Sequence, residues 1–194
     1  LEKRGYRVEI GESVGNSFGY LAGDDDIRLR DIENMFERPE IEAIFCARGG
    51  YGTPRLLSRL NYDIIAKNPK IFVGYSDITA LQMAILNKTG LVTLSGPMAC
   101  VEMALCIDSG TEQSFWETIT QSKNARTLSP LTDDGWRVIQ PGEAEGRLLP
   151  GCLALVVALQ GTPYFPGLDD AIFVFEDVGE PPRRIDACLL YTSD

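Results

Sequence analysis

The 194-residue sequence contains no histidine. A serine nucleophile is most often activated by an adjacent histidine, so this chain cannot complete such a catalytic group from its own residues. Either another side chain acts as the base, or the chain is not the whole protein. The sequence also starts at Leu1 and not at a methionine, so we expect a native start to be missing.

Long apolar runs and positive charge are also scarce. No apolar run approaches the ~20 residues of a membrane-spanning helix, and no signal peptide is visible. Lysine and arginine number 18 against 28 aspartates and glutamates, which gives a formal net charge of −10. This charge argues against a nucleic acid or an anionic membrane as a partner, because both would repel an acidic surface.

Cysteine is present in an odd number and without any C-x-x-C pair. Two of the cysteines lie in apolar segments, which favours small buried hydrophobic side chains over metal or redox roles. A reducing cytoplasm fits this usage best. The five residues are Cys46, Cys100, Cys106, Cys152 and Cys188.

What is present is typical of a globular protein with a core of its own. Hydrophobic residues make up 44% of the sequence and charged residues 24%. In the first part of the chain, short apolar runs alternate with helical patterns, and this order predicts a parallel α/β sheet. The expected strands are residues 6–10, 44–47, 71–73 and 91–94, and the expected helices are residues 24–36, 54–60, 78–88 and 111–121.

A polar segment, residues 124–142, divides the chain. It contains Pro130, Pro141 and an Asp-Asp-Gly turn signal, and we interpret it as a linker. Residues 1–123 would then form the α/β domain, and residues 143–194 a second, incomplete module. The apolar segments of this module are residues 144–149, 152–159 and 171–175, separated by glycine and proline turns.

Ser76 lies in the segment Gly74–Thr79, where a strand is expected to end and a helix to begin. At such a junction, free backbone N–H groups and the helix dipole can stabilise a developing oxyanion. The nucleophile elbow of serine hydrolases has this geometry, although Ile78 stands where G-x-S-x-G has its second glycine. Ser76 is therefore a candidate nucleophile, and from these six residues alone a helix N-cap is an equally good interpretation.

A glycine-rich loop, residues 47–53, follows the expected strand at residues 44–47. Its glycines allow close approach of the backbone to a ligand, or simply a tight turn. The spacing matches neither G-x-G-x-x-G nor a P-loop, so a nucleotide-phosphate site is not favoured. Beside a serine on a neighbouring strand end, the loop could supply a second oxyanion donor. Arg48 is either a solvated loop charge or an anchor for a substrate carboxylate.

Glu176 ends the apolar run Ile172–Phe175, so it is expected at the end of a strand. A carboxylate in that place can orient a histidine, as the buried aspartate of a hydrolase triad does. An acidic loop without a catalytic role is the alternative.

These segments together resemble the LD-carboxypeptidase family, which also contains the microcin C immunity peptidases. The resemblance extends from about residue 20 to residue 186. The residues that support it are Leu21–Gly23, Arg48–Gly52, Pro69–Lys70, Gly74–Leu81, Gly96–Met98, Leu159–Pro163 and Phe175–Asp177.

The resemblance implies a Ser-His-Glu serine peptidase with a flavodoxin-like parallel-sheet domain, here lacking its first strand, and a small β-rich second domain. Ser76 matches the nucleophile and Glu176 the triad glutamate, and the histidine would lie beyond Asp194. The backbone N–H groups of Asp77 and of the Gly49-Gly50 loop match the oxyanion hole. Arg48 and Tyr51 match substrate-binding positions.

The same resemblance implies a muropeptide substrate, cut between meso-diaminopimelate and a terminal D-alanine in the cytoplasm during wall recycling. No metal or organic cofactor is expected, and a homodimer is an arrangement that the family allows. The chain alone should be inactive, because it lacks the histidine. Two alternatives stay open: an immunity-type peptidase that cleaves aminoacyl-nucleotide amides, and a non-catalytic α/β protein that binds a small molecule.

Some positions depart from the family pattern. Ser95 stands where many members have histidine, and Pro150–Leu153 replace a Gly-Gly-Asn-Leu-like stretch. Residues 187–194 do not continue the pattern at all, so we assign no function to that tail.

Overall fold

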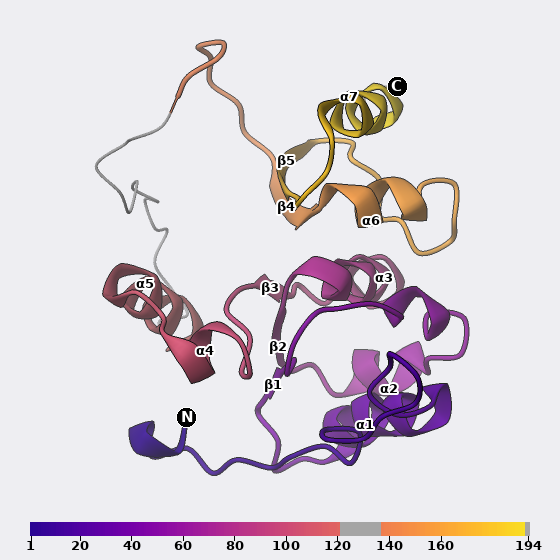
Figure 1. Cartoon of the computed structure of the whole chain (residues 1–194), viewed down its shortest axis with the longest axis vertical. Coiled ribbons are helices and arrows are strands. Elements are labelled where there is room, and N and C mark those ends of the chain that lie inside the picture. The colour runs from indigo at the N-terminus through magenta and orange to yellow at the C-terminus, as the bar shows by residue number, and fades with distance from the viewer. Residues whose placement is uncertain (121–136, 193–194) are drawn as a thin grey trace.

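The computed structural model describes residues 1–120 and 137–192 (Figure 1). A three-stranded parallel sheet lies at the centre of the first part, in the order β1-β2-β3. Its strands are β1 (Ala43–Phe45), β2 (Ile71–Gly74) and β3 (Leu94–Ser95). In register, Ile44 of β1 is opposite Phe72 of β2, and Gly74 of β2 is opposite Ser95 of β3. The predicted parallel α/β sheet is therefore present.

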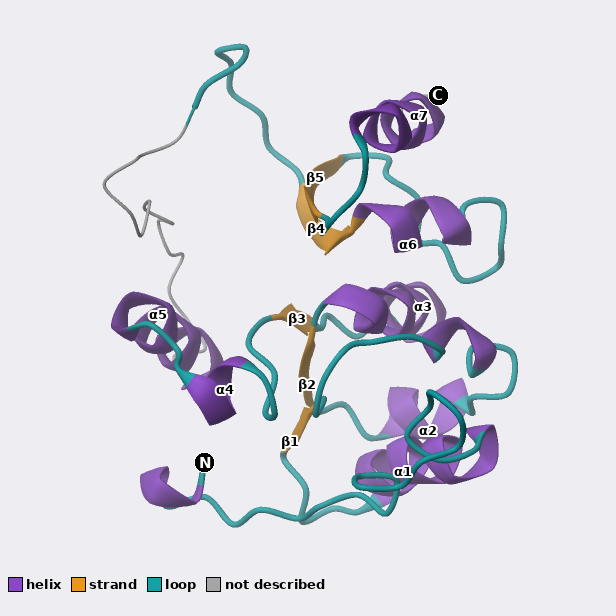
Figure 2. Cartoon of the chain, viewed as in Figure 1, coloured by secondary structure: helices purple, strands orange, loops and turns teal. Residues whose placement is uncertain are grey.

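Helices cover both faces of this sheet (Figure 2). On one side lie α1 (Asp25–Glu37), α2 (Tyr62–Lys67) and α3 (Thr79–Thr89), and on the other lie α4 (Glu102–Leu105) and α5 (Ser109–Thr120). The helix ends follow local signals. The side chain of Asp24 accepts a hydrogen bond from the Ile27 N–H at 2.9 Å and caps α1, while Gly90 ends α3 with φ 75°.

The second part of the chain contains strands β4 (Arg147–Cys152) and β5 (Ala171–Glu176) and helices α6 (Leu153–Leu159) and α7 (Pro182–Thr192). The two strands are parallel, and the chain passes from one to the other through α6. A β-rich module was expected, but its described residues also form two helices, and most of the apolar segment 152–159 is α6. Leu153, Val156 and Leu159 of α6 are buried, which explains why this segment is apolar in the sequence.

Helix α3 lies between the three-stranded sheet and the second module (Figures 1 and 2). All residues from Thr79 to Ile85 are buried, since one side of the helix packs on the sheet and the other on the second module. Gln82 reaches back to the sheet and donates hydrogen bonds to the carbonyls of Gly74, at 3.0 Å, and Leu94, at 2.8 Å. These contacts hold the start of α3 at the carboxyl end of β2.

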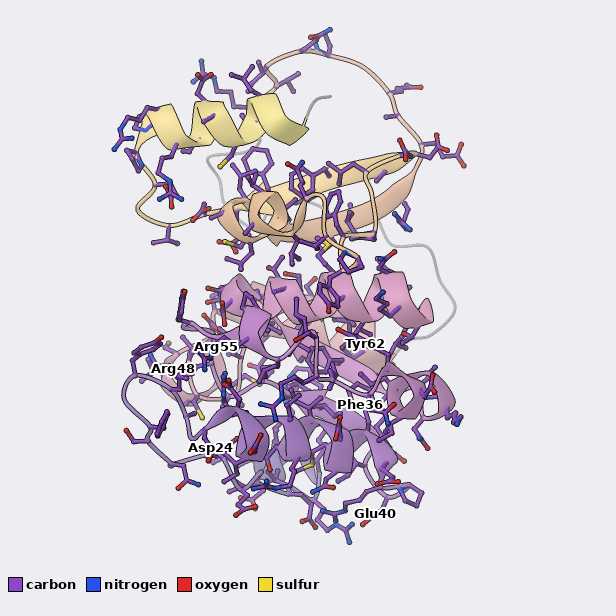
Figure 3. The ribbon with its side chains drawn as sticks, turned by 90° about the vertical axis from the view of Figure 1, so that its right-hand side faces the viewer. Asp24, Phe36, Glu40, Arg48, Arg55 and Tyr62 are labelled. Carbon is purple, nitrogen blue, oxygen red and sulfur yellow. The ribbon has the colours of Figure 1, made fainter. Side chains whose placement is uncertain are left out.

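The core beneath the sheet includes Phe36 of α1 and Phe72 of β2, whose rings stack with centroids 5.9 Å apart. Figure 3 shows Phe36 within the lower layer of helices. Burial of each such side chain contributes about 1.5–3 kcal/mol to folding. In the described ranges, 1–120 and 137–192, no helix is both long enough and apolar enough to cross a membrane.

Several expected elements differ in the structure. Residues 6–10 form no strand: the Tyr6 ring stacks on Trp116 of α5 instead, with centroids 5.5 Å apart, and Glu9 forms an ion pair with Arg38 at the end of α1. Residues 54–60 form only a 3₁₀ turn, Thr53–Arg55, and irregular turns, although Leu56, Leu57 and Leu60 are buried as a helix would require.

The neighbouring elements are shifted or were missed. Helix α2 begins at Tyr62, capped by Asn61, just after the expected helix. The strand expected at residues 91–94 pairs only at Leu94–Ser95. Of the expected linker, residues 124–136 lie outside the described residues, and residues 137–142 have no regular structure. The boundaries at residues 123 and 143 stay a prediction.

Candidate active site

Ser76 lies in the turn between β2 and α3. Its φ is 61°, in the left-handed region that residues other than glycine rarely adopt. The N-cap of the 3₁₀ turn Ser76–Ile78 is Tyr75, and the N-cap of α3 is Ile78. Neither residue makes a capping hydrogen bond with its side chain, and Ser76 is the N-cap of neither element. The N-cap interpretation of Ser76 is therefore wrong. A serine held in this strained conformation after a parallel strand is the arrangement of a nucleophile elbow.

Gly49 of the glycine-rich loop lies directly against Ser76. A Cβ atom at Gly49 would stand 3.0 Å from the Cβ of Ser76, 3.1 Å from its Oγ and 3.6 Å from the backbone nitrogen of Asp77. Any side chain at residue 49 would therefore occupy the space beside the serine hydroxyl. Gly50 follows with φ 105°, so both glycines are required by the geometry. The loop and the Asp77 N–H meet beside Ser76, as the sequence predicted.

Asp77 links the loop to the serine turn through its side chain. The residue is buried, and its Oδ2 accepts a hydrogen bond from the backbone N–H of Thr53 at 2.8 Å. Thr53 is the residue after the last glycine of the loop. The two segments that flank the Ser76 hydroxyl are thus tied together by a buried carboxylate.

Glu176 is the last residue of β5, and it brings the second module to the serine turn. Burial raises the pKa of its carboxyl, and the nearby charge of Asp177 adds to this shift. The backbone N–H of Ser76 interacts with the same carboxyl and acts in the opposite direction. Ser76 and Glu176, 100 residues apart in the numbering, therefore lie side by side.

Tyr75 is fixed beside the same site. Its hydroxyl donates to Oε1 of Glu102 in α4 at 2.5 Å, and Oε2 of Glu102 accepts the Met98 N–H at 3.0 Å. The hydrogen bond to Glu102, with burial and the charges of Glu102 and Glu176, raises the pKa of Tyr75 to about 12. Tyr75 therefore stays protonated at neutral pH, where it is a hydrogen-bond donor and not a base.

A charged cluster supports the other end of the glycine loop. Asp25 accepts hydrogen bonds from Arg55 and Arg28, with 2.8 Å between Nη2 of Arg55 and Oδ2 of Asp25. These two bonds lower the pKa of Asp25 to about 2. Arg28 also donates to the carbonyl of Gly52 at 3.4 Å. A Cβ at Gly52 would stand 2.6 Å from Cδ2 of Leu21, so the loop fits closely onto this cluster.

Arg48 and Tyr51, the expected substrate-binding residues, are both exposed. Arg48 makes no ion pair with any residue that the structure describes, and it lies on the same face as Arg55 (Figure 3). The Tyr51 ring packs edge-on against Tyr20, with centroids 5.7 Å apart, and these two rings are 69% and 75% exposed. Both side chains are therefore accessible to a ligand, on the loop whose Gly49 lies against Ser76.

Cys46, at the end of β1, is not a competing nucleophile. Burial raises the pKa of its thiol to about 12, so the thiolate is scarce at neutral pH. Cys152 is buried at the end of β4.

Sequence reasoning missed the polar groups that support these residues: Tyr20, Arg28, Glu102 and the Asp77 side chain. A signal was present for Tyr20 and Arg28, since both flank the Leu21–Gly23 segment quoted for the family resemblance. For Glu102 there was none, because its partner Tyr75 is 27 residues away and no periodic pattern joins them.

Comparison with known proteins agrees with this geometry. The family model described as LD-carboxypeptidase N-terminal domain matches residues 1–96, and the model described as LD-carboxypeptidase C-terminal domain matches residues 145–192. A probable murein peptide carboxypeptidase of Bacillus subtilis (strain 168) is 41% identical over 192 residues, which are 97% of this chain and 59% of that protein.

Two further relatives are similar. The microcin C7 self-immunity protein MccF of Escherichia coli is 29% identical over 201 residues, 90% of this chain and 58% of that protein. The crystal structure of muramoyltetrapeptide carboxypeptidase from Oxalobacter formigenes superimposes with a TM-score of 0.83 at 32% identity, over 100% of this chain and 64% of that one.

The chain thus spans roughly three fifths of the length of these relatives, between 58% and 64%. The superposition confirms the predicted α/β fold with its parallel sheet. The two family models lie on the parts of the chain that carry Ser76 and Glu176, and the chain belongs to the LD-carboxypeptidase family.

Proposed function

We propose that the longer gene product that contains this sequence is a serine carboxypeptidase of muropeptides. It would hydrolyse the amide between meso-diaminopimelate and the terminal D-alanine of a tetrapeptide stem. The observation that carries the proposal is the left-handed Ser76, with Gly49 and Glu176 both next to it. The similarity to a murein peptide carboxypeptidase supports the choice of substrate.

In this mechanism the Oγ of Ser76 attacks the carbonyl carbon of the scissile amide, and a general base takes the hydroxyl proton. The carbonyl oxygen becomes an oxyanion, which the N–H groups of Asp77 and of the Gly49-Gly50 loop stabilise. The proton then passes to the departing amine of D-alanine, and the C–N bond breaks. Water attacks the acyl-enzyme, releases the tripeptide and restores the serine.

The base in this proposal is a histidine from the part of the gene product that this chain does not include, as the family resemblance implies. Glu176 would accept a hydrogen bond from that imidazole and stabilise its charged form. The raised pKa of Glu176 supports this role. Burial and Asp177 destabilise its charged form, and a cationic imidazolium beside it would stabilise that form.

Arg48 and Tyr51 would bind the substrate next to the scissile bond. A carboxypeptidase must recognise a free carboxylate, and the exposed guanidinium of Arg48 can bind one with two parallel hydrogen bonds. Tyr51 would pack against the neighbouring part of the peptide. Neither role requires a cofactor.

The chain of 194 residues should by itself have little activity, because an unassisted serine hydroxyl is a poor nucleophile at neutral pH. We propose a cytoplasmic role in peptidoglycan recycling for the longer gene product, and a homodimer is the assembly to test. If the 194-residue chain shows a hydrolase rate that Ser76→Ala abolishes, the expectation that this chain has little activity is wrong.

An immunity-type activity is the second candidate, and the similarity to the self-immunity protein MccF favours it. The substrate would then be an amide between an aminoacyl group and a modified nucleotide. The same serine chemistry would apply, so the two candidates differ only in what the site binds.

The test uses the longer gene product with L-Ala-γ-D-Glu-meso-diaminopimelate-D-Ala. Mass spectrometry should detect loss of the terminal alanine, and Ser76→Ala should abolish it. Release that persists in the variant would overturn the role of Ser76. No release from the wild type, but cleavage of an aminoacyl-nucleotide amide, would favour the second candidate. Binding without turnover of either substrate would leave a non-catalytic binding protein.

A further inference from the structure

Thr79 connects the serine turn to the second module. It is the first residue of α3, three positions after Ser76, and is only 1% exposed. Its Oγ1 accepts a hydrogen bond from the backbone N–H of Cys152 at 3.0 Å, between residues 73 positions apart in the sequence. The hydroxyl thus makes a long-range contact and does not cap its own helix.

The methyl group of Thr79 is used in the same contact. A Cβ at Gly151 would stand 2.8 Å from Cγ2 of Thr79 and 3.0 Å from Cε of Met83, so the backbone of β4 lies directly on the start of α3. Both branches of the threonine therefore face β4, and its side chain, being β-branched, has little freedom to rotate. Serine would keep only the hydroxyl, and valine only the apolar contact.

The position of β4 is passed on to Glu176 through the parallel ladder. In that ladder Cys152 is opposite Glu176, so a shift of the end of β4 shifts the end of β5. Asp177 holds the following turn, since its Oδ2 accepts the Ala154 N–H at 3.0 Å. The bond between Thr79 and Cys152 is therefore a direct polar link between the end of β4 and the start of α3, which follows the serine turn.

We propose that Thr79 is a positioning residue for the reaction: its hydroxyl holds the end of β4 on α3 and so places Glu176 beside Ser76. This inference rests on the proposed function, in which Glu176 orients the catalytic base. Loss of the hydroxyl leaves the buried N–H of Cys152 without its acceptor, and the end of β4 moves away to find another.

The experiment compares Thr79→Val, Thr79→Ser and Thr89→Val in the longer gene product. Thr89 is the matched control, because it lies at the other end of α3 and its hydroxyl forms local hydrogen bonds, with the carbonyl of Ile85 and the N–H of Leu91. We expect Thr79→Val to lower kcat on the order of 10- to 100-fold with little change in KM, since displacement of about 1 Å has such an effect. Thr79→Ser should retain most of the kcat, and Thr89→Val all of it.

Amide hydrogen exchange provides a readout that does not depend on activity. The Cys152 N–H should exchange faster in Thr79→Val and at the wild-type rate in Thr89→Val. If Thr79→Val does not fold, Gly151→Ala replaces it, because the added Cβ pushes β4 off Thr79 while the hydroxyl stays; kcat should fall in the same way.

Unchanged kcat in Thr79→Val, or an equal loss in Thr79→Ser with normal Cys152 exchange, would overturn the proposal. The two proposals fail separately. A wild-type protein without carboxypeptidase activity would overturn the proposed function. The exchange of the Cys152 N–H would then still decide whether Thr79 holds β4.

Discussion

The backbone N–H of Thr53 donates a hydrogen bond to the buried carboxylate of Asp77 at 2.8 Å. This bond joins the glycine loop to the turn that carries Ser76, and Gly49 of the loop lies directly against Ser76. The side chain of Asp77 therefore organises the site, while its backbone N–H is a candidate oxyanion donor.

Asp77→Ala should destabilise the protein by about 1–3 kcal/mol, because the N–H of Thr53 loses its buried acceptor. The kcat should fall as well, since the loop is released from the turn. Denaturant unfolding and steady-state kinetics measure the two effects. Asp77→Asn, which keeps an acceptor oxygen, should lose less stability; an equal loss in both variants would contradict this account.

Gly49→Ala should lower kcat on the order of tenfold or more while the fold is retained. The new methyl group would stand 3.1 Å from Oγ of Ser76, where the substrate carbonyl would enter in the proposed mechanism. Gly142→Ala is the matched control, because nothing lies within 4 Å of a Cβ at that residue. Equal kinetics for the two variants would show that Gly49 does not face the reaction.

Ser76→Gly should be more stable than Ser76→Ala by about 0.5–1 kcal/mol. Both variants lose the hydroxyl of the proposed nucleophile, but only glycine relieves the left-handed strain at φ 61°. The strain amounts to about 1–2 kcal/mol, and the greater freedom of glycine in the unfolded chain offsets part of it. Thermal and denaturant unfolding of the pair measure the difference. A less stable Ser76→Gly would mean that the turn is not strained.

Glu176→Gln should gain stability relative to the wild type as the pH rises. Folding raises the pKa of Glu176, so its contribution to stability is complete below the unfolded carboxyl value of about 4.3 and is lost as the pH rises through the higher folded value. Glutamine does not titrate, so the difference between the two proteins should appear over that window and then stay constant. Unfolding between pH 4 and pH 8 measures it, and a pH-independent difference would contradict the raised pKa.

Local patterns in the sequence were sufficient for the elements next to the site. The apolar run at residues 71–73, the helix that follows it and the stop at Gly90 are all present, because strand burial and helix capping depend on neighbouring residues. The same holds for α1 and its Asp24 cap. The juxtaposition of the glycine loop with Ser76 was also predictable, since the carboxyl ends of adjacent parallel strands meet at one edge of the sheet.

The sequence by itself therefore determined the family, the parallel α/β sheet and the candidate residues Ser76, Gly49 and Glu176, because these depend on short motifs and local periodicity. Only the tertiary structure decided that Tyr6–Ile10 forms no strand, that Ser76 is strained, and that Thr79 binds Cys152 across 73 residues. The physical reason is that these outcomes depend on which partner a backbone group finds at long range. Such partners are chosen by packing, and no local pattern of residues specifies them.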